Sequence, residues 1–221
     1  MKNGITTVPE PTLRRLPRYL QVLKKMERAG VTDVSSTGIA NELRINSILV
    51  RKDIECTGII GRPKTGYTVT DLIAAIEAFL NWDNLTDAFL VGVGHLGSAI
   101  LGYQNFKQYG VNIIAAFDLD DEKVGREIHG KEVLPMEKLL DLCSRMHIHI
   151  GVITVPVDSA QLVADLMIQG GITAIWNFAP TELQVPNGII VENTPFSQSL
   201  AVLSHKLKES KKAKQMESIS Q

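Results

Sequence analysis

A glycine-rich turn between two apolar segments constrains this chain more than any other feature. The stretch FLVGVGHLGSAILGY, residues 89–103, holds Gly92, Gly94 and Gly97 in the spacing G-x-G-x-x-G. The apolar residues before the turn predict a strand over 88–91, and the small and apolar residues after it predict a helix. A strand, this turn and a helix, in that order, are typical of an α/β domain that binds a dinucleotide.

An acidic residue follows the next predicted strand. Residues 112–117 (NIIAAF) read as a buried strand, and Asp118 comes 21 residues after Gly97, where such folds place the carboxylate that binds the adenosine ribose. The residues after Asp118 are Leu119, Asp120 and Asp121, with no Lys or Arg directly following it. Because this acidic run would repel a 2′-phosphate, the sequence favours NAD(H) over NADP(H).

The rest of this region continues to alternate between strand and helix. The pattern predicts strands at 148–155, 172–178 and 188–192, and helices at 159–169 and 196–209. Ligands of parallel sheets bind beyond the carboxyl ends of the strands. We therefore expect four further residues near the cofactor: Thr154, Val155, Pro156 and Asn177.

The first eighty residues have a different pattern. Apolar residues at helical spacing predict a helix over 12–29 that Gly30 ends. Ser35 or Ser36 then caps a short helix, and Asn46 or Ser47 caps the next one after a gap of a few residues. Two short helices joined by a tight turn predict a helix-turn-helix, whose second helix enters the DNA major groove. That helix carries Arg51 and Lys52.

The segment TGIIGRPKTGYTV, residues 57–69, adds a basic hairpin. Its glycines stand among β-forming residues beside Arg62 and Lys64, which predicts the wing of a winged helix. Charge supports this assignment, because residues 1–80 hold 12 Lys and Arg against 8 Asp and Glu, whereas residues 81–204 hold 6 against 14. A basic module joined to an acidic one indicates that only the first binds a polyanion.

These patterns together predict an α/β protein with an N-terminal winged helix-turn-helix domain, a Rossmann-like parallel-sheet domain and a C-terminal helix. The expected bounds are 1–82, 83–193 and 194–209, followed by a frayed polar tail at 210–221. We expect a cytoplasmic protein, since no segment reads as a signal peptide or a membrane span. With only Cys56 and Cys143, we expect neither disulfides nor a metal site.

An enzyme of this fold would need an acid or base and a substrate anchor. Neither is visible after the strand at 172–178, and none of the five histidines stands in a pattern that indicates catalysis. We therefore expect a sensor with no catalytic residues. A small NAD-dependent oxidoreductase remains the alternative, as does a regulator of another nucleotide, because many ligands share the adenosine ribose.

The order and spacing of nine segments also resemble a known family. They are RRLPRYLQVL, VSSTGIA, VRKDI, the G-x-x-G-x-x-x-x-GY wing, VGVGHLGSAILGY, AAFDLDDEKVG, TVP, NFAP and VEN. They resemble the redox-sensing transcriptional repressor Rex, and the resemblance covers about residues 8 to 207. The resemblance implies a homodimer that binds a palindromic operator and releases it when NADH, rather than NAD+, is bound. It also implies that the C-terminal helix is swapped, lying between the two domains of the partner subunit.

The resemblance further implies which residues bind. Candidate DNA-binding residues are Asn46, Ser47, Arg51, Lys52, Arg62 and Lys64. Candidate residues for NADH and NAD+ are Gly92, Val93, Gly94, His95, Leu96, Gly97, Asp118, Thr154, Val155, Pro156 and Asn177, with Tyr103 and Phe196 near the nicotinamide. Arg51 either reads a guanine or clamps a phosphate, and the sequence slightly favours the first.

The chain departs from the family pattern at several positions. Gln21 and Pro195 stand where Rex proteins often have Arg and Asp, so a charged latch between these positions is expected to be absent. Leu49 replaces a common Gln in the recognition helix, and Pro63 and Lys64 replace a common Arg-Gly in the wing. The resemblance therefore predicts the mode of DNA binding but not the operator sequence.

Overall fold

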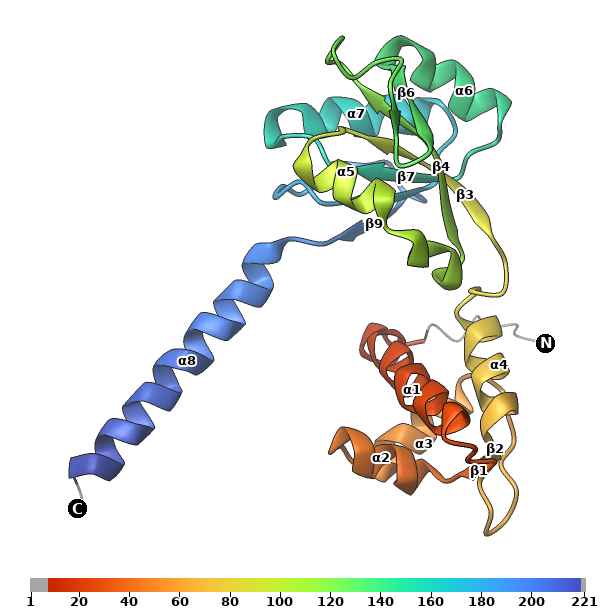
Figure 1. Cartoon of the computed structure of the whole chain (residues 1–221), viewed down its shortest axis with the longest axis vertical. Helices are drawn as coiled ribbons and strands as arrows, with labels where there is room; N and C mark the ends of the chain where they lie inside the picture. Colours follow the sequence, from red (N-terminus) through yellow and green to blue (C-terminus); the bar gives the residue numbers. More distant parts are fainter. Residues whose placement is uncertain (1–7, 220–221) are drawn as a thin grey trace. The chain divides into compact units, whose positions relative to one another are not determined.

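The chain divides into two compact units in the computed structural model, which describes residues 8–219 and the side chains of residues 8–212 (Figure 1). The first unit reaches to Asn84 and takes in Gln108–Gly110, and the second comprises Leu85–Lys107 and the residues from Val111 onward. The sequence analysis places the boundary between residues 82 and 83 and does not anticipate that 108–110 belong with the first unit.

From residue 8 onward, four helices and a two-stranded sheet form the first unit. They are α1 (Glu10–Arg28), β1 (Asp33–Val34), α2 (Ser36–Leu43), α3 (Ser47–Glu55), β2 (Tyr67–Thr68) and α4 (Val69–Phe79). The two short helices begin at polar caps: Ser35 Oγ accepts a hydrogen bond from the Gly38 amide at 3.1 Å, and Asn46 Oδ1 accepts one from the Ile48 amide at 2.8 Å. All four helices contribute apolar side chains to one core.

The loop between α3 and β2 forms the predicted hairpin. Arg62 and Gly66 exchange two backbone hydrogen bonds, of 2.6 and 3.0 Å, and so close its tip. At the base of the hairpin β2 pairs antiparallel with β1. The sequence analysis does not predict β1, because two residues are too few to show an alternating pattern.

A seven-stranded sheet forms the second unit, with the order β5-β6-β4-β3-β7-β8-β9. Its strands are β3 (Thr86–Val91), β4 (Val111–Asp118), β5 (Glu127–Ile128), β6 (Lys131–Pro135), β7 (Ile150–Ile153), β8 (Ala174–Asn177) and β9 (Ile190–Asn193). Every neighbouring pair is parallel except β5 with β6. Because β3 comes first and the chain builds outward on both of its sides, the crevice beside β3 is the expected ligand site.

Helices cover both faces of this sheet (Figure 1). The helix α5 (His95–Gly102) packs on one face, while α6 (Leu139–Arg145) and α7 (Val157–Gln169) pack on the other. The sequence analysis predicts no element between residues 119 and 147, yet β5, β6 and α6 lie there. These elements have two, five and seven residues, too short for a periodic pattern to stand out.

The C-terminal helix α8 runs from Phe196 to Ile219. The expectation of a frayed tail is therefore wrong for residues 210–219, whose backbone is helical, and residues 220–221 lie outside the described part of the chain. No helix among the described residues is long and apolar enough to span a membrane. Within the same residues, no group of three His, Cys, Asp or Glu side chains is placed to hold a metal ion.

Candidate functional site

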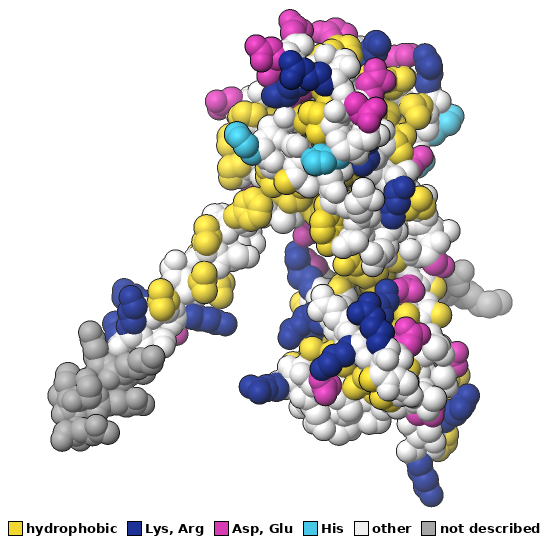
Figure 2. Space-filling view, in the orientation of Figure 1, with side chains coloured by type: hydrophobic (Ala, Val, Ile, Leu, Met, Phe, Trp, Pro, Cys, Tyr) yellow, Lys and Arg dark blue, Asp and Glu magenta, His cyan; other side chains and the backbone are white. Residues whose placement is uncertain are grey.

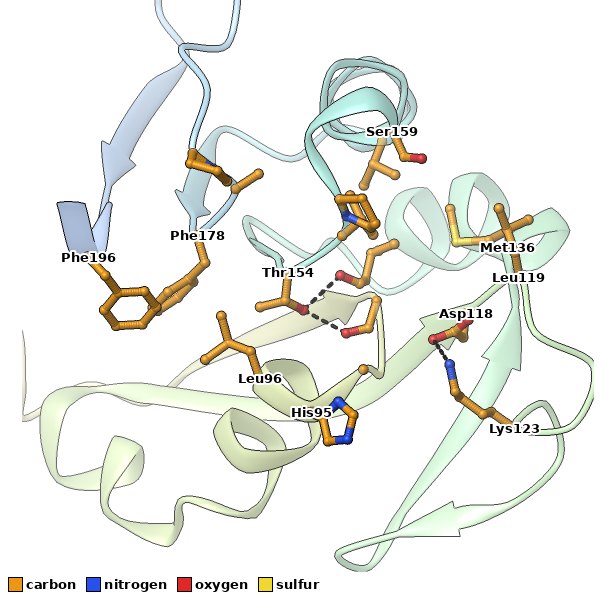
Figure 3. Close-up of a pocket in the computed structure, with 18 residues that line it drawn as sticks. His95, Leu96, Asp118, Leu119, Lys123, Met136, Thr154, Ser159, Phe178 and Phe196 are labelled. Atoms are coloured by element: carbon orange, nitrogen blue, oxygen red, sulfur yellow. Dashed lines mark hydrogen bonds and ion pairs between the residues drawn. The ribbon is translucent and has the colours of Figure 1, made fainter.

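A cavity of about 650 Å³ lies at the carboxyl ends of β3, β4, β7 and β8 (Figure 3). Its lining is mostly apolar, with an acidic end and an aromatic end. The lining residues are Val91, Gly92, Gly94, His95, Leu96, Asp118, Leu119, Lys123, Met136, Thr154, Val155, Pro156, Ser159, Val163, Phe178, Ala179, Pro180 and Phe196.

The glycine turn has the geometry that a phosphate-binding turn requires. Gly92 has a φ of 98°, in the left-handed region that favours glycine. A Cβ at Gly97 would collide with the carbonyl oxygen of Gly92, so only glycine lets α5 pack this close to β3. Thr154, which directly follows β7, stabilises the turn. Its hydroxyl donates to the carbonyl oxygens of Val91 at 3.0 Å and Gly92 at 2.7 Å (Figure 3).

Gly94 faces open space. A Cβ built there meets no atom within 4 Å, and its φ of −77° is ordinary for any residue. No side-chain hydrogen bond caps α5 at this residue, its N-cap, so the first amides of the helix are free of a side-chain cap. The turn therefore offers amide donors and the positive end of a helix dipole to an anion in the cavity.

Asp118 ends β4 at the acidic end of the cavity. Its carboxylate accepts hydrogen bonds from the Val93 amide at 2.7 Å and the Asp120 amide at 3.0 Å, and pairs with Lys123 Nζ at 3.3 Å. Hydrogen bonds to the carboxylates of Asp120 and Asp118 raise the pKa of Lys123 above its ordinary value. The Val93 contact joins Asp118 to the glycine turn, so both are held in one arrangement.

Lys123 corrects one premise of the sequence analysis. That analysis finds no cation directly after Asp118, but the chain turns back and places Lys123 beside it in the cavity wall. The ammonium also pairs with Asp120 at 3.1 Å, so two carboxylates surround one cation. The local charge remains negative, and the preference for NAD(H) over NADP(H) keeps its physical basis.

Aromatic side chains form the opposite end of the cavity. Phe178 and Phe196 lie side by side there, across the cavity from Asp118 and Lys123 (Figure 3). The centroid of the Trp176 ring lies 4.7 Å from that of the Phe178 ring. Trp176 Nε1 donates a hydrogen bond to Thr194 Oγ1 at 2.8 Å. This end of the cavity has no charged side chain in its lining.

Four residues predicted to bind the cofactor do not line this cavity. Val93 and Gly97 belong to the glycine turn and are buried, and Tyr103 lines a separate hollow of about 250 Å³ beside Phe106. Asn177 is fully buried, and its amide donates to the Ala179, Thr181 and Asn193 oxygens. Its role in this structure is to shape the loop after β8 rather than to face a ligand. The other nine predicted residues line the cavity.

Sequence reasoning missed half of the lining. Phe178, Ala179 and Pro180 belong to the segment NFAP. Because ligands bind beyond the carboxyl ends of strands, these residues could have been predicted as part of the site. Met136 and Ser159 give no signal of this kind, because they come from a short connection and a helix whose distance from the turn only the fold determines.

The first unit presents a basic surface on α3 and the hairpin. Figure 2 shows Lys and Arg side chains spread over this unit. Arg51 and Lys52 are exposed on α3, where Arg51 Nε lies 3.7 Å from Glu55 Oε1. Two apolar side chains, Ile48 and Leu49, are also exposed on this helix, at 56% and 37%. The side chain of Asn46 is occupied as the helix cap.

The hairpin tip carries an unusual backbone. Lys64 has a φ of 66°, a left-handed conformation that glycine or asparagine usually adopts in turns. Pro63 precedes it, and Arg62, Pro63 and Lys64 are all exposed. The tip therefore presents two cations from a closed turn.

A buried carboxylate links α3 to α1. Asp53 is 2% exposed, and its oxygens accept hydrogen bonds from Thr12 Oγ1 at 2.9 Å, Tyr19 OH at 2.6 Å, Arg15 Nε at 2.7 Å and Arg15 Nη2 at 2.8 Å. Burial alone would raise the pKa of Asp53, but these hydrogen bonds and the Arg15 charge outweigh it and lower the pKa. Sequence reasoning missed this group, because its partners lie 34 to 41 residues away.

We expect this carboxylate to make the first unit acid-sensitive. Because folding lowers the pKa of Asp53 below its unfolded value of about 4, its contribution to stability is present above that pH and is lost as the pH falls through the folded pKa. Urea unfolding from about pH 3 to 7 measures this, with Trp82 as the reporter of the first unit in a Trp176→Phe background. Asp53→Asn should be less stable at neutral pH and show a flatter acid slope; an unchanged slope would contradict the assignment.

Two family models match the chain. One, described as "Putative DNA-binding protein N-terminus", matches residues 7–54, and the other, described as "CoA binding domain", matches residues 83–181. The first covers α1 to α3 within the described chain, and the second covers the glycine turn and every strand of the larger sheet except β9. The first match lies within the first unit, and the second match lies almost wholly within the second unit.

Curated relatives match almost the whole chain. A redox-sensing transcriptional repressor Rex from Treponema denticola is 45% identical over 193 residues, covering 87% of this chain and 92% of the relative. The Rex of Bacteroides thetaiotaomicron is 42% identical over 202 residues, covering 91% and 92%.

Solved structures give the same result. The crystal structure of RSP, a Rex-family repressor, in complex with β-NAD+ and operator DNA has a TM-score of 0.88 and 33% identity, covering 96% of this chain and 98% of that one. The structure of RSP with β-NADH has a TM-score of 0.85 at the same identity, covering 96% and 99%.

Proposed function

The chain belongs to the Rex family of redox-sensing transcriptional repressors, and on this premise we propose that NADH bound in its Rossmann-like unit releases its winged-helix unit from a palindromic operator. The protein is a regulator rather than an enzyme, so the oxidoreductase alternative is set aside. The single observation that carries the proposal is the cavity beside β3, which combines a phosphate-binding turn, an acidic end and an uncharged aromatic end.

The two ends of the cavity orient the dinucleotide. Asp118 accepts hydrogen bonds and so suits the adenosine ribose, while the amides of the glycine turn suit the pyrophosphate. The nicotinamide then lies toward Phe178 and Phe196. Cofactor-binding roles for Gly92, Gly94, His95, Leu96, Thr154, Val155 and Pro156 follow from the same placement.

The aromatic end supplies the redox discrimination. The nicotinamide of NAD+ carries a positive charge, whereas the ring of NADH is neutral. Burying a charge without a partner is costly, and the lining near Phe178 and Phe196 holds no carboxylate to offset that cost. NADH is therefore the form that should fill this end fully, and its stronger binding to the DNA-free state shifts the population away from DNA.

Another adenine nucleotide is the remaining rival ligand. The match to a family described as "CoA binding domain" covers the same fold, and CoA shares the adenosine diphosphate part with NADH. Its extra ribose phosphate would meet Asp118 and Asp120, whose charges outnumber that of Lys123. We therefore favour the dinucleotide and include CoA as a competitor in the experiment that closes the Discussion.

The helix α8 supports a homodimer. Leu200, Leu203 and Leu207 are 54% to 64% exposed and form an apolar stripe at helical spacing. An exposed apolar stripe of this kind needs a partner surface to cover it. We propose that the second subunit provides this surface and that α8 lies between that subunit's two domains. Two identical DNA-binding units related by a two-fold axis then read a palindrome. We also propose that the protein acts in the cytosol.

We expect the hairpin to bind phosphate without reading sequence. Lys64→Ala should weaken binding to an operator and to a scrambled duplex equally and lower the salt slope by about 1. Lys64 has a left-handed φ that glycine adopts without strain. Lys64→Gly therefore removes the charge without straining the backbone, so it distinguishes the effect of the charge from that of the backbone. Fluorescence anisotropy over a salt series measures both variants, with Lys138→Ala in the second unit as control. A loss confined to the operator, or wild-type binding by Lys64→Gly, would contradict this role.

A further inference from the structure

Four hydrogen bonds from one face of α1 converge on a single carboxylate of α3. The donors are Thr12, Arg15 and Tyr19, which are three and four residues apart and so share a helix face. The Arg15 guanidinium supplies two of the four bonds as a fork, and all distances lie between 2.6 and 2.9 Å. Tyr19 is fully buried and Thr12 is 5% exposed, so their two bonds are shielded from water, whereas the Arg15 side chain is 21% exposed.

The carboxylate stands on the inner face of α3. Asp53 lies beside Val50 and Ile54, which are both fully buried, whereas Arg51 and Lys52 are exposed. The rotation of α3 about its own axis therefore decides both which residues meet α1 and where Arg51 and Lys52 point. Fixing Asp53 fixes the direction of the basic side chains.

Apolar packing alone would fix this rotation poorly. Contacts of Val50 and Ile54 are non-directional, so a modest turn of the helix costs little as long as apolar area stays covered. Hydrogen bonds to a charged group are directional, and the two-bond guanidinium fork also fixes the plane of the carboxylate. Replacing a buried ion pair by apolar side chains of the same size is often neutral for stability, so stability alone does not account for this cluster.

We propose that the cluster of Thr12, Arg15, Tyr19 and Asp53 is a positioning device that sets the rotation of α3 and thereby the ability of the protein to discriminate its operator from other DNA. The inference rests on the proposed function, because it takes α3 as the helix that reads the major groove. Asp53 touches no DNA in this account and acts through Arg51 and Lys52.

The decisive variant replaces the cluster by apolar side chains. Arg15→Met with Tyr19→Phe and Asp53→Leu removes the fork, the buried hydroxyl and the carboxylate together, while the Thr12 hydroxyl can turn to a helix carbonyl. Because apolar replacement of a buried ion pair is often neutral for stability, we expect the triple variant to fold. We expect its discrimination between operator and scrambled duplex to fall by about 10-fold, with binding to the scrambled duplex unchanged.

Milder variants and a control distinguish an effect on the orientation of α3 from an effect on the stability of the first unit. Arg15→Lys keeps the charge but not the two-bond fork, and should lower discrimination by a few-fold. Tyr19→Phe removes one bond and should have a smaller effect of the same sign. The control is the ion pair Lys24 Nζ–Glu77 Oε1, at 2.6 Å, which joins α1 to α4 and does not involve α3. Lys24→Met with Glu77→Gln should leave discrimination unchanged.

The probe is a palindromic duplex that the wild-type protein selects from a random library, compared with its scrambled form by anisotropy well below the melting temperature of each variant. A wild-type protein that shows no preference overturns the proposed function itself. A wild-type preference that the folded triple variant retains in full overturns only the positioning role. If the triple variant does not fold, Arg15→Lys decides: reduced discrimination in a folded protein supports the role, and full discrimination overturns it.

Discussion

Gly94→Ala is expected to weaken the response to NADH strongly while leaving the fold and DNA binding intact. The new Cβ meets no protein atom within 4 Å and the backbone there is ordinary, so the second unit should fold normally. The methyl group stands where the turn opens to the cavity, and in the proposed complex it lies where the pyrophosphate approaches the amides. Overpacking of this kind costs about 1–3 kcal/mol, which weakens binding by about 5- to 150-fold.

The matched comparison is Gly97→Ala. Its Cβ would collide with the Gly92 carbonyl oxygen, so this variant should lose thermal stability of the second unit as well as NADH binding. Calorimetric titration of NADH and thermal melts distinguish the two variants. A Gly94→Ala protein that binds NADH with wild-type affinity would show that the cavity beside β3 is not the dinucleotide site.

Ending the chain at Asn193 is expected to abolish both the dimer and the NADH response. The truncation removes α8 with Leu200, Leu203 and Leu207, and each leucine buried against a partner contributes about 1.5–3 kcal/mol. It also removes Phe196 from the aromatic end of the cavity. Light scattering measures the mass of the truncated protein, and anisotropy measures its release from DNA by NADH.

Two further variants sharpen this prediction. Ending the chain after Lys212 keeps the whole apolar stripe and should leave a dimer that responds to NADH. Changing Leu200, Leu203 and Leu207 together to Gln keeps the helix but removes the stripe, and should give a monomer. A truncation at Asn193 that stays dimeric and still releases DNA would show that α8 is dispensable.

The sequence predicted those parts of the cavity whose chemistry is tied to fixed spacing. Gly92, Gly94 and Asp118 lie on a turn and a strand end that follow each other closely along the chain, so their separation carries the geometry. Lys123 and Asn177 show the limit of this reasoning. The first turns back toward Asp118, and the second turns away to hold a loop, and neither direction is visible without the fold.

Burial of charged residues was the other limit. Charged residues of short helices are mostly exposed, so nothing in the pattern marks Asp53 as buried, whereas its donors on α1 bury it. The short elements β6 and α6 were missed because five and seven residues show no clear period. The helical backbone at 210–219 was missed because its composition, rich in Ser and Lys, is also typical of unstructured tails.

The most direct test of the account titrates NADH, NAD+, NADPH and CoA against the protein bound to a fluorescent palindromic duplex. NADH should release the DNA at much lower concentration than NAD+, because a ligand shifts a two-state equilibrium only by its differential affinity for the two states. NADPH and CoA should release it weakly, because their extra phosphate meets Asp118 and Asp120. Equal release by NADH and NAD+ would contradict redox sensing, and stronger release by CoA would assign the cavity to another nucleotide.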